Sequence, residues 1–80
     1  MPVFEIFEGI KICIFSNDHV PPHIHASIGE HEVLISIKEA NIMVGNLPKS
    51  QLRKAIKFVE NNQNELLEAF YGLNPEIKKI

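Results

Sequence analysis

Histidines gather in one short stretch of this eighty-residue sequence. His19, His23 and His25 follow closely on Asp18, with a Pro21-Pro22 pair between them. If His23-Ile24-His25 is a strand, its two imidazoles project side by side, because residues two apart share a face. Neutral imidazoles and a carboxylate suit divalent transition metals such as zinc. The spacing therefore predicts a candidate metal site made of Asp18, His19, His23 and His25.

Two other interpretations of the same histidines stay open. They are exposed strand residues, or hydrogen-bond donors that pin the loop before the strand. His19 or His23 has the chemistry of a general base, but the sequence offers no accompanying nucleophile, since Cys13 is typical of a small core residue. Catalytic residues and any enzymatic reaction are therefore unassigned.

The elements that position the histidines are short strands. Five segments are rich in β-branched and aromatic residues or bounded by turn residues: Val3–Phe7, Ile10–Phe15, His23–Ile28, His31–Ile37 and Asn41–Gly45. Two-residue turns, Glu8-Gly9 and Gly29-Glu30, predict hairpins with glycine where a positive φ is needed.

The second hairpin has a predictable register. Its turn sets Ile28 opposite His31 and continues to Ile24 opposite Ile35, which gives one apolar face. The other face then carries His23 and His25, and a slip of one residue would reverse this assignment.

Helical periodicity begins after Pro48, which suits a first helical turn. Leu52, Ala55, Ile56 and Val59 form one apolar stripe, and Leu66, Leu67, Phe70 and Tyr71 form a second. Asn61–Asn64 interrupts the pattern. Asn62 with Glu65 resembles a capping box, and Gly72 fits a C-terminal cap. Two helices are predicted, with one kinked helix as the alternative.

Strands followed by helices indicate an α+β fold. We expect a single domain over residues 1–80, with an antiparallel β-sheet of four to five short strands followed by two C-terminal helices packed on one face. The other face is left to solvent or to a partner. Because so small a core is marginal and Val3–Phe7 or Asn41–Gly45 should be a sheet edge, we expect a homodimer.

The amino-acid composition limits which classes of partner and which cellular compartment are expected. The net charge is −2 and the single cysteine excludes an internal disulfide, which favours a reducing cytoplasm. Neither a secretory signal nor a membrane span is expected. Lys49, Arg53 and Lys57, with Lys54 beside them, form a basic row typical of a solvated helix face. Nucleic acid is not the expected partner, and binding through this row should be weak at most.

The loop motif from Ser16-Asn17-Asp18-His19 to Pro21-Pro22-His23-Ile24-His25 resembles a small bacterial family, domain of unknown function 4160. Gly9-Ile10-Lys11-Ile12, Gly45-Asn46-Leu47-Pro48-Lys49 and Glu65-Leu66-Leu67 extend the resemblance over almost the whole chain. The family commonly has an aromatic at Ile24 and a tryptophan near Phe58 and Phe70, so packing differs here while the histidines remain.

The resemblance also implies a partner, because members are often encoded beside another small domain of unknown function, in what looks like a toxin–antitoxin arrangement. We therefore expect a small cytoplasmic protein-interaction domain whose partner is a second small protein, a second copy, or both. The alternative is a metal-binding module or metal-dependent enzyme that uses the Asp18-His19 and His23-x-His25 cluster.

Overall fold

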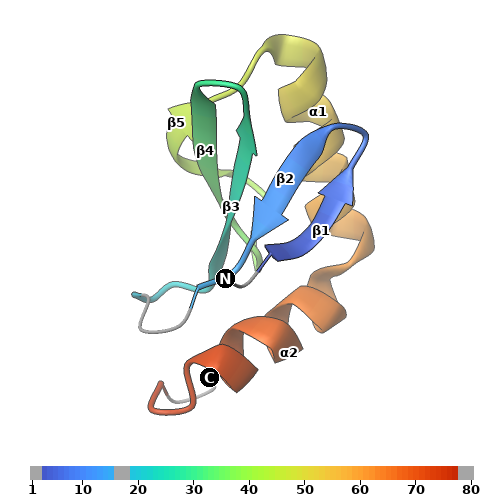
Figure 1. Ribbon diagram of the computed structural model, residues 1–80. Coiled ribbons are helices and arrows are strands. Elements are labelled where there is room, and N and C mark those ends of the chain that lie inside the picture. Colours follow the sequence, from blue (N-terminus) through green and yellow to red (C-terminus); the bar gives the residue numbers. More distant parts are fainter. Residues whose placement is uncertain (1–2, 16–18, 78–80) are drawn as a thin grey trace.

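A five-stranded antiparallel sheet forms the body of the protein, and two helices follow it (Figure 1). The computed structural model describes residues 3–15 and 19–77. The elements are β1 (Val3–Phe7), β2 (Ile10–Cys13), β3 (His23–Ile28), β4 (His31–Ser36), β5 (Ile42–Asn46), α1 (Lys49–Asn61) and α2 (Gln63–Leu73). The strands lie in the order of the sequence, so β1 and β5 are the two edges. The α+β prediction, with sheet before helices, is confirmed.

Two tight turns set the registers of the hairpins. Glu8 and Gly9 both have positive φ, +50° and +83°, as the β1–β2 turn of type I′ requires. Gly29, at φ +57°, begins the β3–β4 turn. Ile28 then pairs with His31 and Ile24 with Ile35, as predicted.

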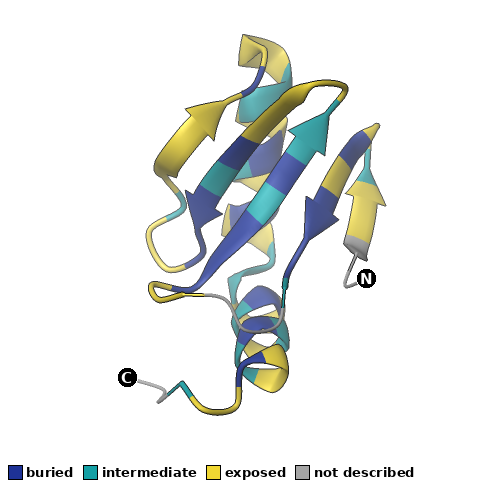
Figure 2. Cartoon of the chain, turned by 60° about the vertical axis from the view of Figure 1, so that its left-hand side comes forward, coloured by how far each residue is buried: buried dark blue, intermediate teal, exposed yellow. Residues whose placement is uncertain are grey.

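The core lies between the helices and one face of the sheet. Ile10 and Ile12 of β2 and Ile24 and Ala26 of β3 are fully buried there, because alternate strand residues point to the same side. From the helices, Ala55, Val59, Leu66 and Phe70 close the core, so both predicted apolar stripes are confirmed. Figure 2 shows buried residues concentrated in the central strands and the inward faces of the helices, whereas β5 is exposed throughout.

The strand ends differ slightly from prediction. β2 ends at Cys13 and β4 at Ser36, each before the apolar run stops, and β5 begins at Ile42. Ile14 and Ile37 are nonetheless buried. The predicted strands were therefore too long, because the hydrophobic residues continue beyond the last pair of hydrogen-bonded strand residues.

The helix ends correct three further predictions. Pro48 is the residue before α1 and not part of its first turn. Asn62 separates the two helices. Its side-chain amide donates to the carbonyl of Phe58 at 2.8 Å, and among the described residues the structure shows no side-chain hydrogen bond from Asn62 to the N-terminus of α2. The capping box is therefore wrong. Gly72 lies inside α2, which ends at Leu73 with Asn74 as its cap.

The two-helix prediction itself is confirmed, and α2 reaches past the end of the sheet near the start of β3 (Figure 1). Gln63 fixes the junction to the sheet, since its amide donates to the carbonyls of Ile37 at 2.9 Å and Lys38 at 3.2 Å. These bonds hold α2 close to the segment that precedes β3 and carries His19, which is called the histidine loop below.

Candidate functional site

The paired histidines of β3 are adjacent on one face of the sheet. His23 and His25 are two residues apart on a regular strand, and their ring centroids lie 5.1 Å apart. Ser36 and Leu34 stand opposite them on β4. The predicted juxtaposition of the two rings is therefore present.

His23 is buried, with only 3% of its surface exposed. Its Nδ1 lies 2.8 Å from the carbonyl oxygen of Pro21. A carbonyl oxygen can only accept, so Nδ1 carries the proton and a neutral ring has its lone pair on Nε2. The ring also packs against Phe70 of α2, at a centroid distance of 5.9 Å. The expectation that this sheet face is left to solvent or to a partner therefore fails at the His23 end, because α2 of the same chain covers it.

His25 is held by one aromatic ring and one carboxylate. The ring of Phe15 meets it edge-on at 4.6 Å. Its Nδ1 lies 3.2 Å from Oε2 of Glu32, across the β3–β4 hairpin. A carboxylate is an acceptor, so this geometry again favours the Nδ1–H tautomer.

Of the two remaining predicted ligands, the structure describes only His19. His19 is described and exposed, whereas Asp18 lies outside the described residues. Among residues 3–15 and 19–77, no group of three or more histidine, cysteine, aspartate or glutamate side chains is arranged to hold a metal. His31 is exposed and pairs with Ile28, so it belongs to the other face, as predicted.

Sequence reasoning missed a residue that positions the histidine loop, Asn74. This side chain is fully buried, and its amide donates to the carbonyls of Phe15 at 3.0 Å and Phe70 at 2.9 Å. It ties the end of α2 to the segment that leaves β2, where Phe15 contacts His25. No local pattern could have shown this, because Asn74 and Phe15 are distant in the sequence.

Cys13 also lies near the histidines. It is a free, buried thiol that stands directly opposite His25 in the β2–β3 pairing. Cys13 shares its sheet face with Lys11, because the two residues are two apart on β2. Its burial agrees with the prediction of a small core residue.

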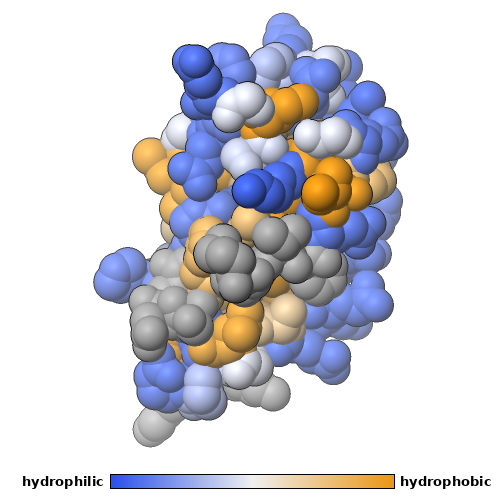
Figure 3. All heavy atoms as spheres, in the orientation of Figure 1, coloured by the Kyte–Doolittle hydropathy of each residue, from blue (hydrophilic) through white to orange (hydrophobic). Residues whose placement is uncertain are grey.

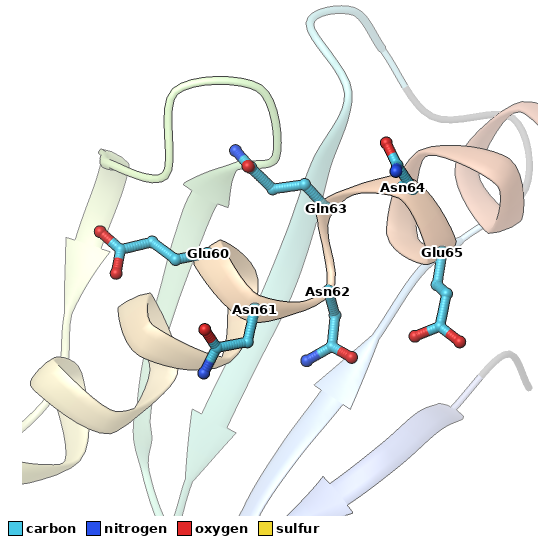
Figure 4. A pocket seen from close by; sticks show the side chains of 6 residues that line it. All are labelled: Glu60, Asn61, Asn62, Gln63, Asn64 and Glu65. Atoms are coloured by element: carbon cyan, nitrogen blue, oxygen red, sulfur yellow. The ribbon is translucent and has the colours of Figure 1, made fainter.

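A polar hollow of about 360 Å³ lies at the α1–α2 junction and is lined by Glu60, Asn61, Asn62, Gln63, Asn64 and Glu65. Figure 4 shows these side chains spreading in different directions and not converging on one point. Gln63 and Asn62 are already engaged by backbone carbonyls. The hollow is therefore a feature of the helix joint and gives no geometry for a ligand.

The outer side of α1 carries the predicted basic row. Lys49, Arg53 and Lys57 are exposed, and a shallow hollow of about 320 Å³ lies among Ser50, Arg53, Lys54 and Lys57. Lys54 pairs with Glu8 at 3.1 Å, where both side chains are about half exposed. Such exposed charges contribute little to stability, so the row is a surface feature.

Edge strand β5 is the most apolar exposed part of the sheet. Ile42, Met43 and Val44 are 42%, 39% and 58% exposed, and Figure 3 shows hydrophobic side chains at the margin that β5 forms. A hollow of about 330 Å³ opens at the start of the strand, lined by Pro21, Ser36, Lys38, Glu39, Asn41, Ile42 and Met43. No described strand pairs with the outer side of β5.

Neither α1 nor α2, as described, is long and apolar enough to cross a membrane. No curated protein and no solved structure matches the chain. The model of one family does match, over residues 9–71, which include β2 to β5, the histidine loop, all of α1 and most of α2. The chain therefore belongs to the family described as a domain of unknown function, DUF4160.

Proposed function

We propose that this protein is a small protein-interaction domain that acts in the cytoplasm as one member of a toxin–antitoxin-like pair. The observation that carries the proposal is β5, an uncharged edge strand with three consecutive exposed apolar side chains. An edge strand presents unpaired backbone groups to any extended chain beside it. Proteins that do not use such an edge usually protect it with charged residues, which β5 lacks.

Strand addition explains how this surface would bind. The backbone of a partner would extend the sheet through hydrogen bonds, while side-chain pockets give specificity. The hollow at the start of β5 has both apolar and charged lining residues, including Ile42, Met43, Lys38 and Glu39. The sheet edge and the hollow together form one continuous docking surface.

Co-expression with a second small protein encoded beside this one, the kind of partner that the family resemblance implies, tests the proposal. We expect the two proteins to co-purify as a complex of defined stoichiometry, and expression of one alone to slow growth that the other restores. Independent elution of the two folded proteins, with no effect of either on growth, would contradict the proposal.

A second candidate function is metal binding, and the tautomers of the two histidines favour it. Metal-ligating histidines commonly donate their other ring N–H to a backbone carbonyl or a carboxylate. His23 and His25 have these two partners at Nδ1, Pro21 and Glu32 respectively. The Nε2 atoms would then be the ligating atoms, with His19 or Asp18 as the third ligand.

Calorimetric titration of zinc or nickel into untagged protein tests this second candidate. Wild type and His31→Ala should bind equally, whereas His25→Ala should lose affinity by tenfold or more. Binding should also weaken in acid, because a ligating imidazole must be neutral. Equal binding by wild type and His25→Ala, or loss in His31→Ala alone, would exclude the site.

A further inference from the structure

A bulge in β5 shapes the hollow at the start of that strand. Leu34 of β4 pairs with Val44, and the next residue of β4 pairs with Ile42. Met43 is therefore an extra residue on β5. Successive residues of a regular strand point to opposite faces, whereas a bulge bends the strand and re-aims its side chains. Ile42 and Met43 can therefore both line the hollow of about 330 Å³, although they are neighbours in the sequence.

Ser36 is the buried polar residue that lines this hollow, with only 4% of its surface exposed. Its Oγ accepts a hydrogen bond from the backbone N–H of Glu39 at 3.2 Å. A hydroxyl group also carries one hydrogen to donate, and within residues 3–15 and 19–77 the structure shows no acceptor for it. A group that fills the hollow and excludes water must supply that acceptor, because a buried donor without a partner costs free energy.

The charged residues of the hollow disfavour an ionised occupant. Lys38 and Glu39 are adjacent and exposed, and both line the hollow. A carboxylate placed there would meet the like charge of Glu39, and an ammonium group would meet that of Lys38. Pro21, Ile42 and Met43 contribute apolar walls. The hollow therefore fits a neutral group that has an apolar body and a hydrogen-bond acceptor.

Tyrosine is the side chain that combines these properties. Its ring is large and apolar, and its hydroxyl oxygen can accept a hydrogen bond. The thioether of Met43 is suited to contact with an aromatic ring. A phenylalanine ring would leave the hydroxyl hydrogen of Ser36 without an acceptor, and the amide of asparagine or glutamine would leave the apolar walls uncovered.

Backbone hydrogen bonds hold the walls of the hollow in place in the free protein. The N–H of Ser36 donates to the carbonyl of Asn41 at 2.9 Å, which closes the connection between β4 and β5. The N–H of Ile37 donates to the carbonyl of Pro22 at 3.0 Å, which fixes the segment that carries Pro21. Because the walls are already ordered, an occupant pays little entropy for ordering them.

We infer that this hollow is a specificity pocket for a tyrosine side chain of the partner strand, whose phenolic oxygen accepts a hydrogen bond from Oγ of Ser36. The inference rests on the proposed function, because it names the residue that a strand added at β5 places in the hollow. Strand addition obtains affinity from backbone hydrogen bonds and specificity from such pockets. Tyrosine is also among the residues that dominate binding energy at protein interfaces.

NMR titration of the whole protein with two small probes tests the pocket without the partner. N-acetyl-tyrosinamide should shift the backbone amide signals of Ser36 and Met43. It should bind about fivefold more tightly than N-acetyl-phenylalaninamide, as one additional net hydrogen bond predicts. Equal affinity of the two probes, or shifts confined to α1, would overturn the inference.

Matched variants assign the preference to the serine. Ser36→Ala should bind the two probes equally, whereas Ser50→Ala, which alters the hollow on α1, should keep the preference for the tyrosine probe. Met43→Ala changes a residue that is 39% exposed and should weaken the binding of both probes, so it tests the pocket if Ser36→Ala fails to fold. A preference that persists in Ser36→Ala, or undiminished binding to Met43→Ala, would overturn the inference.

The outcomes separate this inference from the proposed function. Co-purification with the second small protein, together with no preference for the tyrosine probe, would overturn the inference alone. Binding of the tyrosine probe with the expected preference, together with no complex between the two proteins, would contradict the proposed function and leave the phenol-binding pocket intact.

Discussion

Replacing His23 with alanine should destabilise the protein more than any other single histidine substitution. The ring is buried, donates to the Pro21 carbonyl at 2.8 Å and packs against Phe70 and His25. Loss of the hydrogen bond contributes about 1 kcal/mol. The cavity left by the imidazole adds about 2 kcal/mol, less than the loss of a larger buried phenyl ring.

The summed loss, about 3 kcal/mol, is a large part of the total free energy of unfolding, which is roughly 4 to 12 kcal/mol for a domain of eighty residues. His25→Ala loses an edge-on contact with Phe15 worth about 1 kcal/mol. Its hydrogen bond to Glu32 adds little, because that carboxylate is about half exposed. His31 is exposed, so His31→Ala should stay within about 0.5 kcal/mol of wild type.

Urea unfolding followed by circular dichroism measures these differences, provided that the slope of the transition stays constant between variants. The order of destabilisation should be His23→Ala, then His25→Ala, then His31→Ala. His23→Ala with the same midpoint as His31→Ala would refute the account of His23 as the clamp of this loop. Repeating the series in chelator separates this structural role from stabilisation by a bound metal.

Two further predictions concern β5 and the basic row. Gly45→Ala should lower the free energy of unfolding by about 3 kcal/mol, because Gly45 has a φ of +87° and a Cβ there would overlap the carbonyl oxygen of Glu32. Gly29 has a φ of +57° but open space around it, so Gly29→Ala should lower the free energy of unfolding by only about 1 kcal/mol. Equal urea midpoints for the two variants would contradict the tight β4–β5 contact at Gly45. Any binding of DNA by the basic row Lys49, Arg53 and Lys57 should be weak and should fade as the salt concentration rises. Fluorescence anisotropy measures this binding. Tight binding that persists at high salt would contradict the interpretation of the row as a solvated helix face.

Much of the sheet was predictable because its determinants are local. Glu8-Gly9 and Gly29-Glu30 specify two-residue turns, and once the second turn is known, period-2 alternation places every residue from His23 to Ser36. The same reasoning put His23 and His25 on one face and His31 on the other. It also showed Asn41–Gly45 to be a potential edge, although the strand itself is displaced by one residue.

The rest depended on packing between distant segments. Nothing near His23 in the sequence shows that Phe70 will cover it, so its burial was missed. Asn74 looks like an ordinary polar residue after a helix, and its role appears only when α2 meets Phe15. Asn62 has the residue type for a cap, but its side-chain amide donates back to the carbonyl of Phe58, and in the described part of the chain no side-chain oxygen caps α2.

Measuring the mass of a mixture of this protein and a candidate partner, a second small protein encoded beside it, tests the central proposal most directly. Light scattering on the mixed, purified proteins should show a single species heavier than either protein alone, and Val44→Lys should abolish it while Ile6→Lys leaves it intact. Two separate species at the masses of the individual proteins would contradict the proposal that this domain acts through protein binding.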